Sequence, residues 1–145
     1  MPLIYNTKVI INATPEKVWE ALTTPEMTMQ YMFGCKCETD WKIGSPVLWR
    51  GASDGVVYVS GKVVRFEPSA VLSYTIFDPN GTHPDVPENH LIGEFILTPN
   101  TDGGTTLRVF QGDYNKVPDG EKRYNEAAPG WKMTLTALKK AVEEA

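Results

Sequence analysis

Apolar and polar residues alternate along most of the chain. In the first such stretch the apolar Tyr5, Val9 and Ile11 stand at odd positions. The polar Asn6 and Lys8 stand at even positions. Because successive side chains of a strand point to opposite faces, this pattern predicts a half-buried strand. The same reasoning predicts strands over residues 3–12, 36–41, 47–50, 56–66, 71–77, 90–98 and 105–111. Short turns join most of them, so we expect an antiparallel sheet.

Two helix-start signals follow the first predicted strand. Thr14, Pro15 and Glu16 supply a capping side chain, a residue suited to the first turn and a negative charge near the positive end of the helix dipole. Thr24-Pro25-Glu26 repeats the signal at once, and Gly34 is a stop signal. The sequence therefore predicts two short helices before the second strand, the second of them carrying Met27, Met29, Tyr31 and Met32.

The last predicted element is one long amphipathic helix over residues 121–145. Pro129 lacks an amide, so we expect a kink there; the alternative is that the regular helix begins near Pro129. Asp119 is expected to cap the helix. Inside the longest predicted strand, Gly61 indicates a bulge. The apolar residues of the helix recur at helical spacing and form one stripe, which consists of Tyr124, Trp131, Leu135, Leu138 and Val142.

These elements predict an α+β protein in which a twisted sheet wraps around the C-terminal helix. Residues 1–145 contain no domain boundary or repeat, so we expect one domain. A net charge of −4 argues against a nucleic-acid partner, which requires a basic surface. No apolar run reaches the roughly 20 residues of a membrane span. The first residues do not resemble a signal peptide, so we expect a cytoplasmic protein.

Both ends of the chain resemble one known family. Residues 11–26, including Ala13-Thr14-Pro15-Glu16-Lys17-Val18-Trp19 and Thr24-Pro25-Glu26, are similar to the opening signature of the START/SRPBCC superfamily, in the branch named after the activator of the 90-kDa heat-shock protein ATPase (homologue 1-like). Gly130-Trp131 with Leu135, Leu138 and Lys139 resembles its C-terminal helix. The resemblance implies the helix-grip (START/Bet v 1-like) fold, with a curved antiparallel sheet of about seven strands around a long C-terminal helix and two short helices after the first strand.

The resemblance also implies a space between sheet and helix, where many family members bind small apolar ligands. Rigid aromatic walls suit such ligands, and methionines adapt to irregular shapes. The expected lining is Met27, Tyr31, Trp41, Trp49, Tyr74, Phe95, Trp131 and Leu135. The alternative is that these side chains fill a solid core. The function expected first is therefore binding of a small hydrophobic molecule, whose identity the sequence does not give.

Two other functions stay open. An enzyme of the cyclase or hydrolase type, acting on an apolar or aromatic substrate, needs an inward-facing polar group, for which Glu94 and Arg108 are the candidates. A chaperone-associated interaction domain needs an exposed apolar patch. The chain contains no nucleophile-elbow, zinc or phosphate-loop motif, so we expect no catalytic residue, cofactor or metal site. The oligomeric state is open.

One loop and two cysteines complete the prediction. The loop 78–89 is long for a compact domain and proline-rich, so we expect it to lie over a cavity mouth. It offers His83, Asp85 and Glu88 for a metal or base role, with solvated turn residues as the alternative. Cys35 and Cys37 alternate on a predicted strand, where a disulfide across one residue is strained, so we expect reduced thiols.

Overall fold

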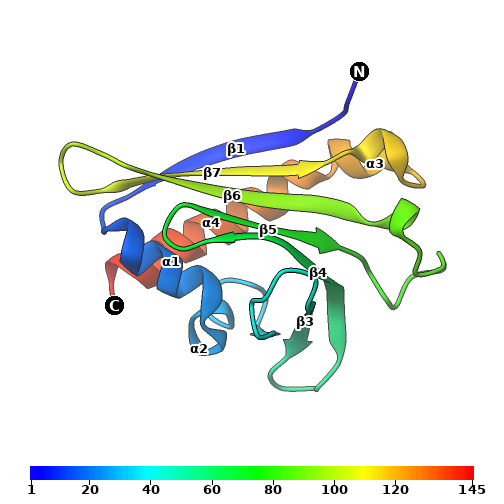
Figure 1. Ribbon diagram of the computed structural model, residues 1–145, viewed down its shortest axis with the longest axis horizontal. Helices are drawn as coiled ribbons and strands as arrows, with labels where there is room; N and C mark the ends of the chain where they lie inside the picture. Colours follow the sequence, from blue (N-terminus) through cyan, green and yellow to red (C-terminus); the bar gives the residue numbers. More distant parts are fainter.

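The computed structural model describes residues 1–145. Its seven strands form one antiparallel sheet in the order β1-β7-β6-β5-β4-β3-β2 (Figure 1). Consecutive strands from β2 to β7 are neighbours, and the first strand pairs with the last. The predicted sheet is therefore confirmed. The strands are β1 (Tyr5–Ile11), β2 (Cys35–Glu38), β3 (Pro46–Gly51), β4 (Val57–Glu67), β5 (Val71–Ile76), β6 (Leu91–Pro99) and β7 (Thr105–Gly112).

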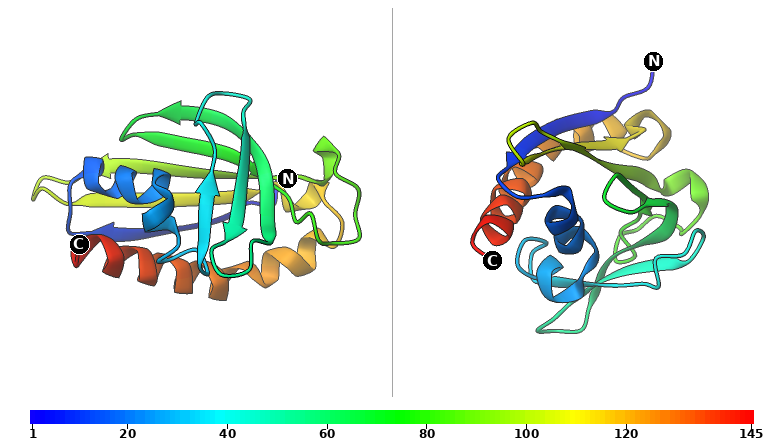
Figure 2. Two further views of the ribbon diagram at one scale, coloured as in Figure 1. Left: turned by 90° about the horizontal axis from the view of Figure 1, so that it is seen from below. Right: turned by 60° about the vertical axis from the view of Figure 1, so that its left-hand side comes forward.

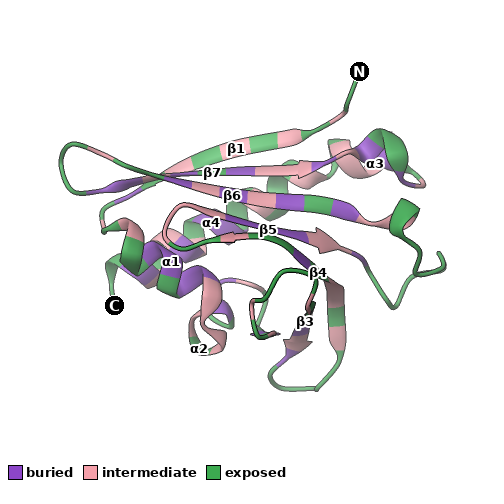
Figure 3. Cartoon of the chain, in the orientation of Figure 1, coloured by how far each residue is buried: buried purple, intermediate pink, exposed green.

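The sheet curls around helices α1 (Pro15–Thr23) and α4 (Ala127–Glu143), which lie on its concave side (Figure 2). Buried and exposed residues alternate along the strands, as Figure 3 shows for β6 and β7. Leu72, Phe95 and Val109 lie side by side across β5, β6 and β7, and all three are buried. The concave face is therefore the apolar one, and the fold expected from the resemblance is confirmed.

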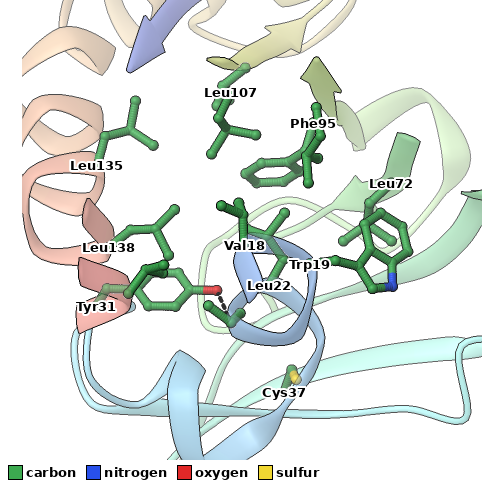
Figure 4. Packing of buried hydrophobic residues seen from close by; sticks show 14 of the residues in the cluster. Val18, Trp19, Leu22, Tyr31, Cys37, Leu72, Phe95, Leu107, Leu135 and Leu138 are labelled. Atoms are coloured by element: carbon green, nitrogen blue, oxygen red, sulfur yellow. Dashed lines mark hydrogen bonds between the residues drawn. The ribbon is translucent and has the colours of Figure 1, made fainter. Parts of the chain in front are cut away.

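Most of the buried apolar residues form one core between α1, α4 and the sheet. Leu135 and Leu138 of α4 point toward Leu107 of β7 and toward Val18 and Leu22 of α1 (Figure 4). This packing uses the stripe predicted for the C-terminal helix, whose Val142 is also buried. The apolar spacing of the sequence thus specifies which face of α4 meets the sheet.

The tandem start signals produce two helices, but the second is shorter than predicted. Thr14 caps α1 by accepting a hydrogen bond from the Lys17 amide at 3.3 Å. A residue before proline favours an extended conformation, so α1 ends at Thr23 and its cap residue Thr24, just before Pro25, is extended. Helix α2 (Pro25–Thr28) lasts only one turn. The prediction that it continues through Met32 is wrong, because residues 29–34 form turns instead.

The C-terminal helix differs from the prediction at its start. It consists of α3 (Gly120–Asn125) and α4, which are separated at Glu126. The kink expected at Pro129 is wrong: Pro129 is the third residue of α4, where an amide has no partner within the helix and none is lost. Asp119 stands at the start of α3, but its side chain makes no capping hydrogen bond.

The long strand β4 is irregular, but not at the predicted place. Gly61 pairs in register with Val47, and the register shifts lie on either side of it. The bulge expected at Gly61 is therefore wrong. A Cβ atom there would lie 1.7 Å from the carbonyl oxygen of Thr75. The glycine is needed because β5 approaches the backbone of β4 this closely.

Side chains of α4 cover the C-terminal end of the free edge of β1. Lys139 Nζ donates to the Ile10 carbonyl at 2.7 Å, and the Glu143 carboxylate accepts from the Asn12 amide at 2.7 Å. Lys139 and Glu143 also bind each other at 2.7 Å. The bond from Asn12, followed by the bond from Lys139, lowers the pKa of Glu143. Because an open strand edge can pair with other chains, these bonds protect this end of β1.

Glu143 is expected to make the stability of the fold depend on pH. A carboxyl whose folded pKa is lowered stabilises the protein above its unfolded pKa, and this stabilisation is lost as pH falls through the folded value. We therefore expect the Tm of the E143Q variant to fall less than that of the native protein between about pH 6 and about pH 3. The control is E144Q, whose carboxylate makes no ion pair. Equal losses in native protein and E143Q would contradict the assignment.

Candidate functional site

Four of the residues predicted to line a cavity form a continuous row of rings. Trp49 of β3 packs on Tyr74 of β5, with ring centres 5.7 Å apart. Tyr74 stacks on Phe95 of β6 at 5.9 Å, and Phe95 meets Trp131 of α4 edge to face at 5.9 Å. The row crosses the concave face from β3 to α4. Leu135, the next predicted residue along α4, is buried in the same core.

Two other predicted lining residues are held by helix α1. The Tyr31 hydroxyl donates to the Ala21 carbonyl at 2.7 Å, and Trp41 Nε1 donates to the Thr23 carbonyl at 3.0 Å. These carbonyls lie at the end of α1, where they have no partner within the helix. Tyr31 and Trp41 therefore cap α1 with their polar tips. Met27, the eighth predicted residue, is half-buried against the core.

A hollow of about 380 Å³ opens at one end of the space between the sheet and α4. We call it the mouth pocket. Leu91 and Gln111 line it from the concave face of the sheet, and Phe33 borders it from the turn after α2. Of the eight predicted residues, only Trp131 lines it. The full lining is Met32, Phe33, Leu91, Gln111, Tyr114, Arg123, Glu126, Ala127, Gly130, Trp131 and Thr134.

The sequence contains a signal for part of this lining. Arg123, Ala127, Gly130 and Thr134 are spaced by four, three and four residues, so they share one helical face beside the apolar stripe. That face carries few large apolar residues, so a search for apolar periodicity alone does not identify it. Tyr114 has no such signal, because it belongs to the short helix η2 (Tyr114–Lys116) after the last strand.

The polar groups of the mouth pocket meet around Tyr114. Gln111 Nε2 donates to the Tyr114 hydroxyl oxygen at 2.7 Å. Arg123 donates to the Pro118 carbonyl at 3.3 Å. Burial raises the pKa of Tyr114, while the bond from Gln111 and the nearby charge of Arg123 act in the opposite direction. Tyr114 therefore stays a neutral phenol at physiological pH, beside a cation.

A larger hollow, of about 1140 Å³, lies on the convex face of the sheet. We call it the outer hollow. Ile92, Ile96 and Phe110 form its apolar part, and Asp85 and Glu88 of the loop 78–89 border it. The loop predicted to lie over a cavity mouth therefore borders the outer hollow.

Most charged groups of the outer hollow already have protein partners. His90 lies with Nε2 2.6 Å from Asp85 and Nδ1 3.1 Å from Thr75 Oγ1. Glu94 lies 3.7 Å from Arg65, and Asp113 accepts hydrogen bonds from two backbone amides. We take the mouth pocket as the candidate site, because Trp131 connects it to the row of aromatic rings in the core.

The structure also places the other residues that were considered for catalysis or metal binding. Glu94 and Arg108 both lie on the convex face, so neither points into the interior. Cys35 and Cys37 are free and buried, as expected, and burial raises the pKa of Cys37 to about 11. No three His, Cys, Asp or Glu side chains are grouped to hold a metal ion, and Asp85 contacts His90 instead of His83. None of the helices has both the length and the apolar character needed to cross a membrane.

Comparison with known proteins supports the fold and gives the family. Similar solved structures include protein MLL2253 from Mesorhizobium loti, with 27% identity, a TM-score of 0.78 and 98% of each chain covered. ChR145 from Cytophaga hutchinsonii is 36% identical, with a TM-score of 0.78 over 98% of this chain and 94% of that one. The Aha1 dimer from Colwellia psychrerythraea is 21% identical, with a TM-score of 0.68 over 97% and 96%.

A search of curated proteins gave no match. The sequence model of one family, described as "Activator of Hsp90 ATPase homolog 1-like protein", matches residues 12–143. This match spans nearly the whole chain and includes both ends on which the resemblance was based. The protein therefore belongs to the family of Activator of Hsp90 ATPase homolog 1-like proteins.

Proposed function

We propose that this protein binds a small, mostly apolar molecule in the mouth pocket, as a single domain in the cytoplasm. The observation that carries the proposal is the position of the pocket. It opens where the concave face of the sheet parts from α4, and Trp131 joins it to the row of aromatic rings in the core. Its volume of about 380 Å³ lies within the range of small-molecule sites.

The lining supports the same proposal. Met32, Phe33, Leu91 and Trp131 give it apolar walls of adaptable and rigid side chains. Phe33 remains 70% exposed although it is a large aromatic residue. A ligand in the pocket would cover part of this surface and gain the free energy of removing it from water. Phe95, another of the predicted residues, packs on Trp131 from the core.

An NMR titration tests the proposal. We expect saturable amide shifts at Met32, Phe33, Leu91 and Trp131 with at least one member of a panel of fatty acids, flavonoids and small aromatic acids. The A127W variant, which fills the pocket, is expected to abolish them. The control is A128W, because Ala128 is exposed and does not line the pocket. Shifts confined to the outer hollow, or none with any compound, would refute binding at this site.

The convex face favours a second candidate, which is association with a protein such as an Hsp90-type chaperone. Ile4 and Ile92, two large apolar residues that line the outer hollow, are exposed. Exposed apolar residues that lie together mark protein contact sites, whereas singly scattered ones need no explanation. Sedimentation of the protein with a purified Hsp90-type chaperone tests this candidate. Co-sedimentation that the I92D variant abolishes would support it, and independent sedimentation would exclude it.

A further inference from the structure

The polar end of the mouth pocket offers hydrogen-bond donors. The Tyr114 hydroxyl oxygen accepts the bond from Gln111 at 2.7 Å, so the hydroxyl hydrogen is left to donate elsewhere. Tyr114 makes no other hydrogen bond through its side chain. Because the residue is only 2% exposed, the hydroxyl has little access to bulk water. A ligand oxygen in the pocket is the natural acceptor.

Arg123 adds a cation without an anionic partner. Its guanidinium has five N–H donors and no acceptor. One of them reaches the Pro118 carbonyl at 3.3 Å, and no carboxylate lies within 4.0 Å of the side chain. Its neighbour Lys122 is paired instead, with Glu126 at 4.0 Å. A half-buried arginine with free donors matches the two oxygens of a carboxylate.

The apolar part of the lining determines which kind of ligand body fits the pocket. Met32, Phe33, Leu91 and Trp131 surround the space beside Tyr114 and Arg123 with apolar surface. A donor-rich end joined to apolar walls fits a molecule with an acceptor head and an apolar body. A head without acceptor oxygens would leave the Tyr114 hydroxyl and Arg123 desolvated and unpaired, which costs affinity.

We propose that the mouth pocket recognises an amphipathic carboxylic acid, whose carboxylate accepts hydrogen bonds from Arg123 and the Tyr114 hydroxyl and whose apolar body lies against Leu91, Phe33 and Trp131. This assignment rests on the proposed function, since it names the ligand class of the same pocket. Glu126 opposes it, because its carboxylate lines the same mouth. Removing that charge is therefore expected to strengthen binding of the acid.

A series of ligands with one body and different heads tests the class. We expect octanoate to bind roughly tenfold or more tightly than octanamide and octanol in calorimetric titrations, because a charge-assisted bond exceeds a neutral one. Octylammonium is expected not to bind. If octanol or octanamide binds as tightly as octanoate, the pocket is an apolar site and the carboxylate assignment fails, although the proposed function survives. If no octyl compound binds but a flavonoid or aromatic compound of the NMR panel does, the carboxylate assignment fails and the proposed function survives. If no compound of either set binds, both fail.

Variants then test the two donors. R123Q is expected to weaken octanoate binding roughly tenfold and to leave octanol unchanged. K132Q is the matched control, because it removes the same charge from an exposed residue of α4 that forms no ion pair and does not line the pocket. E126Q is expected to bind octanoate more tightly than the native protein. Y114F is expected to weaken octanoate selectively, with its Tm recorded to confirm folding. Equal octanoate affinity in R123Q and K132Q would overturn the assignment.

Discussion

Replacing Leu138 by alanine is expected to destabilise the protein by roughly 3 kcal/mol. Leu138 is completely buried in the core, and it points from α4 toward α1 and the sheet (Figure 4). The substitution removes the apolar contacts and leaves a cavity that rigid neighbours fill only in part. Since a domain of this size is stable by about 5–15 kcal/mol, the loss is a large fraction. Urea unfolding measures it, and we expect the Tm to fall by roughly 10 °C.

Met133→Ala is the matched control, because Met133 lies on the same helix and is 63% exposed. Its replacement is expected to change the free energy of unfolding by less than about 0.5 kcal/mol. The slope of the unfolding free energy against urea should stay the same in both variants. Similar losses at positions 133 and 138 would show that α4 does not pack through the face that carries Leu135 and Leu138.

The fold was predictable because its main signals are local in sequence. Alternation along strands such as β6 and β7 specifies their buried faces, and the capping Thr14 and the first-turn Pro25 specify where helices begin. The stripe through Leu135, Leu138 and Val142 specifies how α4 sits on the sheet. Each of these features depends on residues a few positions apart, so the pattern contains the information.

Details that depend on distant contacts were not predictable. The break at Glu126 has no glycine or proline at that position, whereas Pro129 only three residues later is accommodated without a kink. Gly61 indicates a bulge by its type, but its role depends on the carbonyl of Thr75 on another strand. A sequence pattern shows which residues favour an element but not which backbone approaches it.

The candidate site was predicted in part for the same reason. The aromatic residues expected around the interior do gather there, as the row from Trp49 to Trp131 shows. The opening, however, lies at the meeting point of several short segments. Phe33, Tyr114 and Arg123 come from three of them, none with a strong pattern. Composition indicates which side chains suit a pocket, whereas the free space depends on how loops and helix ends meet.

Tyr31 is the site of the second substitution that is expected to have a large effect on stability. Its replacement by phenylalanine is expected to destabilise the protein by roughly 1–3 kcal/mol, the cost of leaving a buried polar group without its partner. The Tyr31 hydroxyl donates to the Ala21 carbonyl at 2.7 Å, and Ala21 is completely buried. The residue four positions after Ala21 is Pro25, which has no amide hydrogen to replace this donor.

The matched control for this prediction is Tyr58→Phe. The Tyr58 hydroxyl also forms a hydrogen bond, to Asp54, but at the exposed surface, where water replaces the lost partner. We expect Y58F to change the free energy of unfolding by less than about 0.5 kcal/mol. If Y31F is equally neutral, the Ala21 carbonyl does not depend on the Tyr31 hydroxyl, and the capping role assigned to Tyr31 is wrong. If Y31F is destabilising as expected, the second helix-start signal leaves the Ala21 carbonyl without a backbone donor, and the Tyr31 hydroxyl supplies the missing bond. The family signature Thr24-Pro25-Glu26 and the buried Tyr31 hydroxyl then form one structural unit, which ends α1.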